Sequence, residues 1–161
     1  MNNNELLKEK LGILIVDDDD DDRALIKEAF EVIQVHNPLC FLENGQNLMD
    51  YLFRRGEYSS KDEYYRPGLI LLDLNMPRKD GREALKEIKS HPALKCIPVA
   101  VFTTSTAQED ILLCYSLGVN TFITKPVTFN SLVEMLRVLT RYWFEIAVLP
   151  PVVESQLISD K

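Results

Sequence analysis

The chain has 161 residues, a hydrophobic fraction of 46% and a net charge of −7 at pH 7. A chain of this length is most simply one domain that buries about two-thirds of its unfolded surface. The negative charge argues against general binding to nucleic acids or anionic membranes, because both require basic patches. An acidic surface would suit a basic partner, although solubility alone also accounts for it.

The cysteines, Cys40, Cys96 and Cys114, are odd in number and widely spaced, without a Cys-x-x-Cys pair. This argues against a disulfide framework or a zinc site and is typical of a reducing cytoplasm. Cys40 and Cys96 lie in apolar segments, so we expect them to be buried. The chain shows no secretion signal and no apolar run of the roughly 20 residues that span a bilayer. We therefore expect a cytoplasmic protein without a membrane segment.

The first predicted element is a buried strand at residues 13–16, where four apolar residues precede six consecutive aspartates at 17–22. A short β-branched run of this kind is typical of a strand inside a sheet. Apolar residues at helical spacing then predict a helix at 23–33. We expect the aspartates at 19–22 to be mainly the N-terminal residues of that helix, where the helix dipole favours negative charge.

The rest of the chain alternates between apolar runs typical of strands and apolar spacings typical of helices. Strands are predicted at 38–43, 69–72, 99–102 and 121–124. Helices are predicted at 46–55, 82–90 and 107–117, and a polar loop is predicted at 56–67. Ser105 or Thr106 can cap the helix at 107–117. Thr128 or Asn130 can cap a last helix, which ends near residue 144.

Four of the predicted strands end in a group that can bind or react, namely Asp17 with Asp18, Asp73, Thr103 and Lys125. The alternation implies one parallel sheet covered by helices on both faces, with right-handed crossovers. In such sheets the functional site lies at the carboxyl ends of the strands, so we expect these side chains to converge. Each residue alone is usually a helix cap or a surface side chain. Their combination, in order, favours a shared site.

The residue types at these strand ends indicate phosphoryl chemistry. Crowded carboxylates repel one another, and a hard ion such as Mg²⁺ takes oxygen ligands of this kind. The ion would lie among Asp18, Asp73 and a backbone carbonyl and would bind the oxygens of an incoming phosphoryl group. Asp73 would attack the phosphorus and form an acyl phosphate. Lys125 would supply a second positive charge to the transferred group, and Thr103 a hydroxyl.

With these residues the chain resembles the receiver domain of two-component response regulators. The matching pieces are Ile-Leu-Ile-Val-Asp-Asp at 13–18, Leu-Leu-Asp-Leu-Asn-Met-Pro-x-x-Asp-Gly at 71–81, Thr103 after an apolar strand, and Lys125-Pro126. The resemblance implies an α/β fold with a doubly wound five-stranded parallel sheet of strand order 2-1-3-4-5, the flavodoxin-like receiver fold. The receiver domain is expected at 12–144, between an N-terminal extension at 1–11 and a C-terminal extension at 145–161.

The resemblance also implies a role for each residue of the acidic group. Asp73 is implied as the phosphoacceptor, to which a histidine kinase transfers a phosphoryl group in a Mg²⁺-dependent reaction. Asp18, Asp73 and the carbonyl of Asn75 are implied as metal ligands, with Asp17 contributing through water. The protein would then be a phosphoacceptor switch that loses its phosphoryl group slowly to water.

Further residues are implied in switching. Thr103 and Lys125 would be the switch hydroxyl and lysine. Phe122, three positions before the lysine, would be the switch aromatic, although packing in the core or in an interface also accounts for it. Asn75 and Ser105 lie two residues after Asp73 and Thr103, near the approach of an attacking water. We expect them to tune dephosphorylation.

A narrower resemblance is to the single-domain response regulators paired with bacterial phytochrome kinases. It is carried by Arg-Arg-Gly-Glu-Tyr at 54–58, Lys-Asp-Gly-Arg-Glu at 79–83, Phe-Thr-Thr-Ser at 102–105, and Tyr-Trp-Phe at 142–144 followed by Leu149-Pro150. The aspartates at 19–22 depart from the usual mixed sequence there. The resemblance implies a phytochrome-type histidine kinase as the partner.

Signal output is expected to use protein contacts, because no room remains for a DNA-binding domain after residue 144. Large aromatic side chains near the end of a chain often mark an interface. We expect residues 107–143, with the C-terminal extension, to form a homodimer. The candidate interface residues are Ile111, Tyr115, Phe122, Trp143 and Phe144. The alternative is that these aromatics pack onto the domain's own core.

Two other functional classes fit these residues less well than the switch does. A Mg²⁺-dependent phosphohydrolase with an aspartyl nucleophile would want a second catalytic aspartate two residues later. That position is Asn75, which cannot act as a general acid. A scaffold that works without phosphorylation would have no need for the full set of Asp18, Asp73, Thr103 and Lys125.

Overall fold

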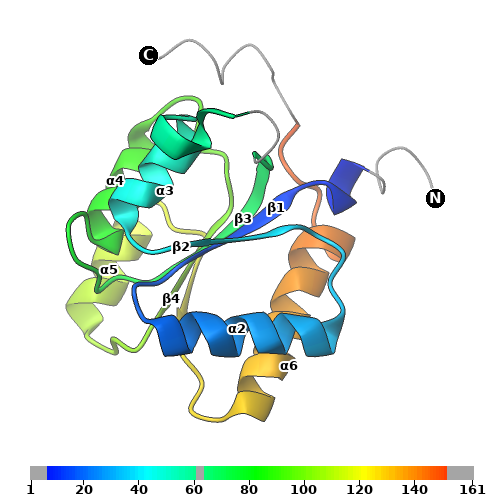
Figure 1. Cartoon of the computed structure of the whole chain (residues 1–161). Helices are drawn as coiled ribbons and strands as arrows, with labels where there is room; N and C mark the ends of the chain where they lie inside the picture. Colours follow the sequence, from blue (N-terminus) through cyan, green and yellow to red (C-terminus); the bar gives the residue numbers. More distant parts are fainter. Residues whose placement is uncertain (1–6, 61–63, 152–161) are drawn as a thin grey trace.

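The computed structural model describes residues 7–60 and 64–151, which form a sheet between two layers of helices (Figure 1). The strands are β1 (Gly12–Val16), β2 (Leu39–Leu42), β3 (Pro67–Leu72), β4 (Val99–Thr103) and β5 (Thr121–Thr124). The helices are α2 (Asp20–Ile33), α3 (Gly45–Leu52), α4 (Gly81–Ser90), α5 (Gln108–Ser116), α6 (Phe129–Arg141), the 3-10 helix η1 (Gly56–Ser59) and the π-helix η3 (Tyr142–Ile146). Parts of the two predicted extensions and of the loop, at 1–6, 61–63 and 152–161, lie outside the described residues.

The sheet has the order β2-β1-β3-β4-β5, and every pairing in it is parallel. This confirms the predicted fold class and strand order. The chain passes from β1 to β2 on one side and then to β3 on the other, so the order reverses at β1. Ligands in open parallel sheets bind at this kind of switch point. Within the described part of the chain, no helix has the length and apolar character to cross a membrane.

Each sheet face has its own hydrophobic core, because successive strand side chains point to opposite faces. In β1, Leu14 and Val16 pack under α3, α4 and α5, whereas Ile13 and Ile15 pack under α2 and α6. Figure 1 shows the same division, with α2 and α6 side by side on one face and α3, α4 and α5 on the other. The strands are therefore held from both sides, which fixes their carboxyl ends.

Side-chain caps determine where most helices begin. Asp19 accepts a hydrogen bond from the N–H of Asp22 at the start of α2, as expected for the aspartate run. Of the two candidates for the last helix, Thr128 is the cap of α6. The helix predicted at 107–117 is α5 at Gln108–Ser116, but the prediction that Ser105 or Thr106 caps it is wrong, because Ala107 is at the N-cap and no side chain caps the helix. The Ser105 hydroxyl donates instead to the side chain of Asp110 in the first turn of α5.

The structure also corrects several predicted boundaries. The helix predicted at 46–55 ends at Leu52, and Arg54 turns the chain with a left-handed φ of 55°. The loop predicted at 56–67 contains the 3-10 helix η1, and α6 continues as η3 to Ile146. Cys96, which was expected to be buried, is exposed because it lies in a turn before β4.

The start of α4 packs directly on the loop that follows β3. A Cβ atom on Gly81 would lie 2.0 Å from the carbonyl oxygen of Asp73 and 2.8 Å from the Cα of Leu74. Both neighbours are backbone atoms, which cannot move aside as a flexible side chain would. The N–H of Gly81 also donates to the carbonyl of Leu74 at 2.9 Å. A glycine at this position therefore sets the path of the backbone at Asp73.

We predict that Gly81→Ala lowers the free energy of unfolding by about 3 kcal/mol, since the methyl group displaces the backbone at Asp73. Gly56→Ala is the control. It has open space around the Cβ position but a φ of +59°, so about 1 kcal/mol of backbone strain is expected. Urea unfolding measures both. A Gly81→Ala protein no less stable than the Gly56→Ala protein would contradict the prediction.

Candidate functional site

Four strand ends bring the predicted residues to one edge of the sheet. Asp17 and Asp18 follow β1, Asp73 follows β3, and Thr103 is the last residue of β4. These strands are neighbours in the sheet, so their carboxyl ends lie side by side. Lys125 follows β5, and its backbone N–H donates to the carbonyl of Thr103 at 2.8 Å. The backbone hydrogen bonds of the sheet thus set the spacing of the functional side chains.

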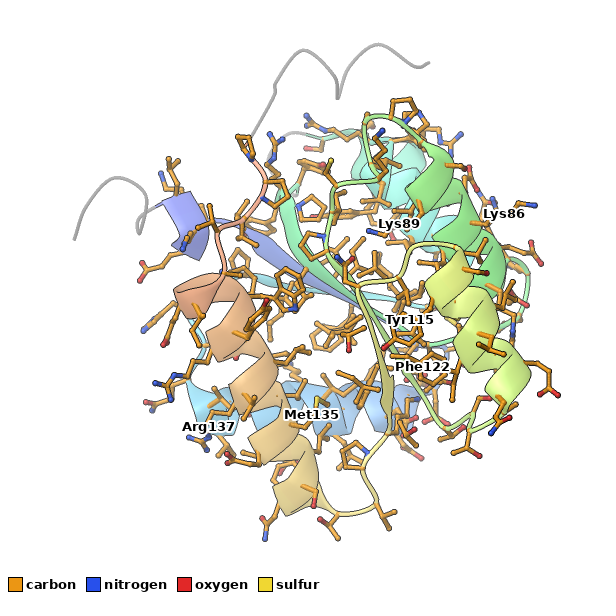
Figure 2. The ribbon with its side chains drawn as sticks, turned by 180° about the vertical axis from the view of Figure 1, so that it is seen from behind. Lys86, Lys89, Tyr115, Phe122, Met135 and Arg137 are labelled. Atoms are coloured by element: carbon orange, nitrogen blue, oxygen red, sulfur yellow. The ribbon has the colours of Figure 1, made fainter. Side chains whose placement is uncertain are left out.

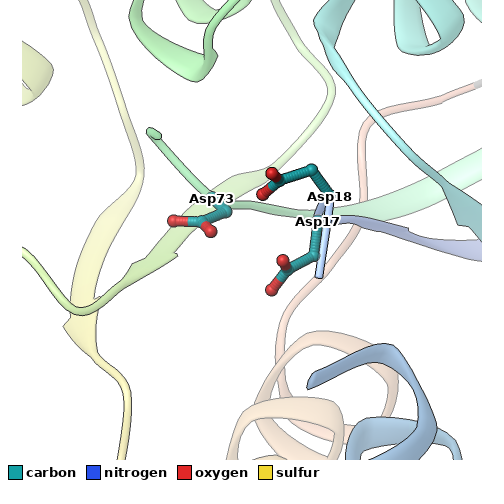
Figure 3. A group of neighbouring side chains, drawn as sticks. All are labelled: Asp17, Asp18 and Asp73. Atoms are coloured by element: carbon teal, nitrogen blue, oxygen red, sulfur yellow. The ribbon is translucent and has the colours of Figure 1, made fainter. Parts of the chain in front are cut away.

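Three carboxylates form an acidic cluster at this edge, as Figure 3 shows. One carboxylate oxygen from each of Asp17, Asp18 and Asp73 lies within 4.8 Å of the others. Asp17 is only 2% exposed and Asp73 8%, whereas Asp18 is exposed. Burial raises the pKa of Asp17, and hydrogen bonds from Lys125 and from the N–H of Asp19 offset part of that rise. Two largely buried carboxylates beside an exposed one are a donor set that suits a hard divalent cation.

Lys125 offsets part of the negative charge of the cluster from the side of β5. Its ammonium group donates to Asp17 at 2.7 Å, to Asp22 at 2.8 Å and to Asp73 at 3.2 Å. Burial alone would lower the pKa of Lys125, but the hydrogen bonds to Asp17 and Asp22 and the nearby carboxylate charges raise it above its ordinary value. The lysine therefore remains charged, and its positive charge lies next to Asp73.

Asp22 is a member of the site that the sequence did not single out. The aspartates at 19–22 were expected to serve as helix N-terminal residues, and they do, yet Asp22 also binds Lys125. The only signal in the sequence was its place in the first turn of the helix. Which aspartate of that turn faces the sheet depends on how α2 is rotated, and the sequence pattern does not give that rotation.

Thr103 and Phe122 occupy different environments. Thr103 is fully buried, and its hydroxyl oxygen accepts a hydrogen bond from the N–H of Ser105 at 3.4 Å. Phe122 is partly buried and packs against the core under α3, α4 and α5. Its backbone N–H donates to the hydroxyl of Tyr115 at 3.2 Å. Phe122 thus packs its side chain on the core, while its backbone is bonded to the Tyr115 hydroxyl.

Asn75 and Ser105 are held by two residues that sequence reasoning missed. The side-chain oxygen of Asn75 lies 3.4 and 3.5 Å from the two terminal nitrogens of Arg82. The hydroxyl of Ser105 donates to Asp110 at 2.6 Å, and Arg82 Nε donates to the same carboxylate at 2.7 Å. Arg82 and Asp110 are in the first turns of α4 and α5, where helical spacing alone made them ordinary surface charges.

The five residues of the predicted interface are spread over two environments. Tyr115 is 50% exposed, and Ile111 is partly exposed. Trp143 and Phe144 are partly buried and pack against the core under α2 and α6, as Phe122 does on the other core. Phe122, Trp143 and Phe144 thus bury part of their surface on the chain's own core, which was the alternative to an interface.

The fold and site together define a class of protein. Residues 13–137 match the family model described as the response regulator receiver domain. The chain belongs to this family, whose members are phosphoacceptors rather than conventional enzymes.

Its relatives include regulators associated with phytochromes. The chain is 41% identical over 138 residues to response regulator Rcp1 of Synechocystis, covering 86% of this chain and 92% of that protein. It is similar to the crystal structure of the phosphorylated cyanobacterial phytochrome response regulator RcpA, with a TM-score of 0.80, 42% identity, and coverage of 88% and 99%. The Mn²⁺-bound form of Rcp1 matches with a TM-score of 0.78, 40% identity and the same coverage.

We predict that Lys125→Gln destabilises the protein by about 3 kcal/mol in metal-free buffer, because it leaves buried carboxylates without their cation. Lys95→Gln, which removes an exposed lysine, should change stability by no more than about 0.5 kcal/mol. Urea unfolding in the presence of a chelator measures both variants. Equal stability of the two variants would show that Lys125 does not offset the charge of the acidic cluster.

Proposed function

We propose that Asp73 is the phosphoacceptor of this receiver domain. A carboxylate oxygen of Asp73 forms a bond to phosphorus as the bond between phosphorus and a kinase histidine nitrogen breaks. The observation that carries the proposal is the position of Asp73. Its carboxylate lies 3.2 Å from the Lys125 ammonium on one side and within 4.8 Å of Asp17 and Asp18 on the other. The family match over 13–137 supports a receiver domain at 12–144, with extensions at 1–11 and 145–161.

A Mg²⁺ ion fits the donor set of this site. Asp18 and Asp73 with the carbonyl of Asn75 would hold it, and Asp17 would contribute through water. The Mn²⁺-bound form of Rcp1 supports a divalent cation in this family. When bound, the ion neutralises charge on the carboxylates and on the incoming phosphoryl oxygens. The exposure of Asp18 leaves the cluster open to solvent on one side, from which an ion can enter.

Lys125 and Thr103 are proposed to hold the transferred group. Lys125 already bears a charge beside Asp73, so it can pair with a phosphoryl oxygen without moving far. Thr103 is at the end of the neighbouring strand, and its hydroxyl can donate to a phosphoryl oxygen. Phe122, between the core and the Tyr115 hydroxyl, is the proposed aromatic that reports this change to the surface.

The proposed phosphodonor is a histidine kinase of the phytochrome type. Its support is the similarity to Rcp1 and to the phytochrome response regulator RcpA. The chemistry of the site depends on Asp73, whereas recognition of the kinase depends on surface residues.

Incubation with acetyl phosphate and Mg²⁺ should add one phosphoryl group to the protein, measured by intact mass. Asp73→Asn should gain none, because an amide cannot form the acyl phosphate. Chelation of the metal should abolish the gain in the wild type. Addition to the Asp73→Asn protein would show that another aspartate is the acceptor. No addition to the wild type, followed by none with a phytochrome kinase, would refute the proposed function.

We propose further that the surface formed by α5, β5 and α6 makes a homodimer. Its exposed apolar side chains include Leu112 at 71%, Tyr115 at 50% and Val138 at 59%. A groove between β5 and α6 is lined by apolar residues that include Ile123 and Met135. Figure 2 shows Tyr115 beside Phe122 and, across β5, Met135 on α6. An apolar surface of this kind is favoured in an interface.

The wild type should sediment as a dimer at micromolar concentration when beryllofluoride mimics the phosphoryl group. A Leu112→Glu, Val138→Glu double variant should sediment as a single chain, because it places two charges in the proposed interface. Val32→Glu is the control, since Val32 is 53% exposed on α2, which is not one of the three elements of the proposed interface. A wild-type mass of one chain, with and without the mimic, would rule out the dimer.

A further inference from the structure

Two charged residues outside the acidic cluster link both loops that border Asp73. Arg82, in the first turn of α4, reaches the loop after β3 through Asn75 and reaches α5 through Asp110. Asp110 in turn accepts the hydroxyl hydrogen of Ser105, in the loop after β4. Asn75 and Ser105 thus belong to one network, although they come from different loops.

The geometry of the network depends on the shape of the guanidinium group. Arg82 donates from Nε to Asp110 at 2.7 Å, while its two terminal nitrogens face Asn75 at 3.4 and 3.5 Å. Asp80 adds an ion pair to the same guanidinium at 3.6 Å. Only arginine offers several donors in one rigid plane, and a lysine ammonium is a single point charge.

Asp110 uses both of its carboxylate oxygens in this network. One oxygen accepts from Arg82 and the other from Ser105. The hydrogen bond from Arg82, and to a lesser extent the one from Ser105, holds the pKa of Asp110 below its ordinary value. The carboxylate therefore stays ionised at neutral pH. The hydrogen bond that Arg82 donates to Asp110 raises the pKa of Arg82 above its ordinary value. The side chains are 26% and 18% exposed, which favours a fixed geometry over a mobile surface pair.

We infer that the pair of Arg82 and Asp110 sets the lifetime of the phosphorylated state by positioning Asn75 and Ser105. The inference rests on the proposed function. Hydrolysis requires a water oxygen to form a bond to phosphorus while the bond to the Asp73 oxygen breaks, which restores the carboxylate and releases inorganic phosphate. The polar atoms that could orient this water are Asn75 Oδ1 and Ser105 Oγ, and both are engaged by the pair.

Arg82 is therefore a positioning residue that protects the acyl phosphate. When the pair is intact, Asn75 Oδ1 faces the Arg82 guanidinium and the Ser105 hydroxyl donates its hydrogen to Asp110, so both side chains are held in one orientation and the Ser105 hydrogen is not offered to an attacking water. Without the pair, both side chains can turn toward the phosphoryl group.

The test measures the lifetime of the phosphorylated protein. Each protein is phosphorylated with acetyl phosphate and Mg²⁺, the donor is removed by rapid desalting, and the remaining phosphoprotein is followed by intact mass. Arg82→Gln and Asp110→Asn should each shorten the lifetime by about 3- to 10-fold. The double variant should be no faster than either single variant, because the two residues act as one unit.

Two further variants separate positioning from charge. Lys86→Gln removes the same charge from the exposed side of α4, where Figure 2 shows Lys86 on the outer surface, and should keep the wild-type lifetime. Arg82→Lys keeps the charge but loses the planar donors, so its lifetime should be as short as that of Arg82→Gln. Urea unfolding of each variant shows whether a shorter lifetime follows a loss of stability.

Several results would overturn the inference. A wild-type lifetime in Arg82→Gln would remove Arg82 from the control of hydrolysis. A wild-type lifetime in Arg82→Lys, or a lifetime in Lys86→Gln as short as in Arg82→Gln, would show that positive charge alone sets the lifetime and that positioning does not. Multiplication of the two single effects in the double variant would show that the residues act separately. A wild type that gains no phosphoryl group would instead refute the proposed function, and the inference with it.

Discussion

One lysine ammonium offsets the repulsion between the carboxylates at the carboxyl edge of the sheet. Lys125 donates to carboxylates from the ends of β1 and β3 and from the first turn of α2. Without that positive charge, Asp17 and Asp73 would be two largely buried anions close to each other, an arrangement that costs several kcal/mol. The same contact that stabilises the sheet edge therefore also places a cation beside the acceptor candidate. A bound divalent ion would share the carboxylates with the lysine, so folding and phosphoryl chemistry depend on one set of charges.

The sequence was informative wherever a local pattern determined the outcome. The apolar runs before Asp17, Asp73 and Thr103 end at residues that the parallel sheet must place side by side. The strand order itself came from the resemblance, since periodicity does not order strands. Asp22, Arg82 and Asp110 were missed for a different reason. Each lies in the first turn of a helix, and its contact depends on how that helix is rotated against its neighbours.

The environment of Asn75 helps to separate a switch from a hydrolase. An aspartyl phosphohydrolase would place an acid at this position, and an amide cannot donate a proton to a leaving group. In the structure, the amide oxygen also faces the Arg82 guanidinium instead of the acidic cluster. A site built in this way has a nucleophile and positive partners but lacks an assigned acid at that position. It favours formation of an acyl phosphate over its rapid turnover.

The two loops that border Asp73 are held by different kinds of contact. The loop after β3 is fixed by backbone contacts: Gly81 bonds to Leu74, Gly45 bonds to the carbonyl of Lys79, and neither glycine has space for a methyl group. The loop after β4 leads into α5, which has no side-chain cap, and its contacts include side-chain hydrogen bonds of Thr103 and Ser105. A phosphoryl group added to Asp73 would displace the loop after β4, held through side chains, more readily than the loop after β3, held through its backbone. The mechanical signal would then travel toward α5 and β5, while α3 and α4 serve as the fixed frame against which that movement is read.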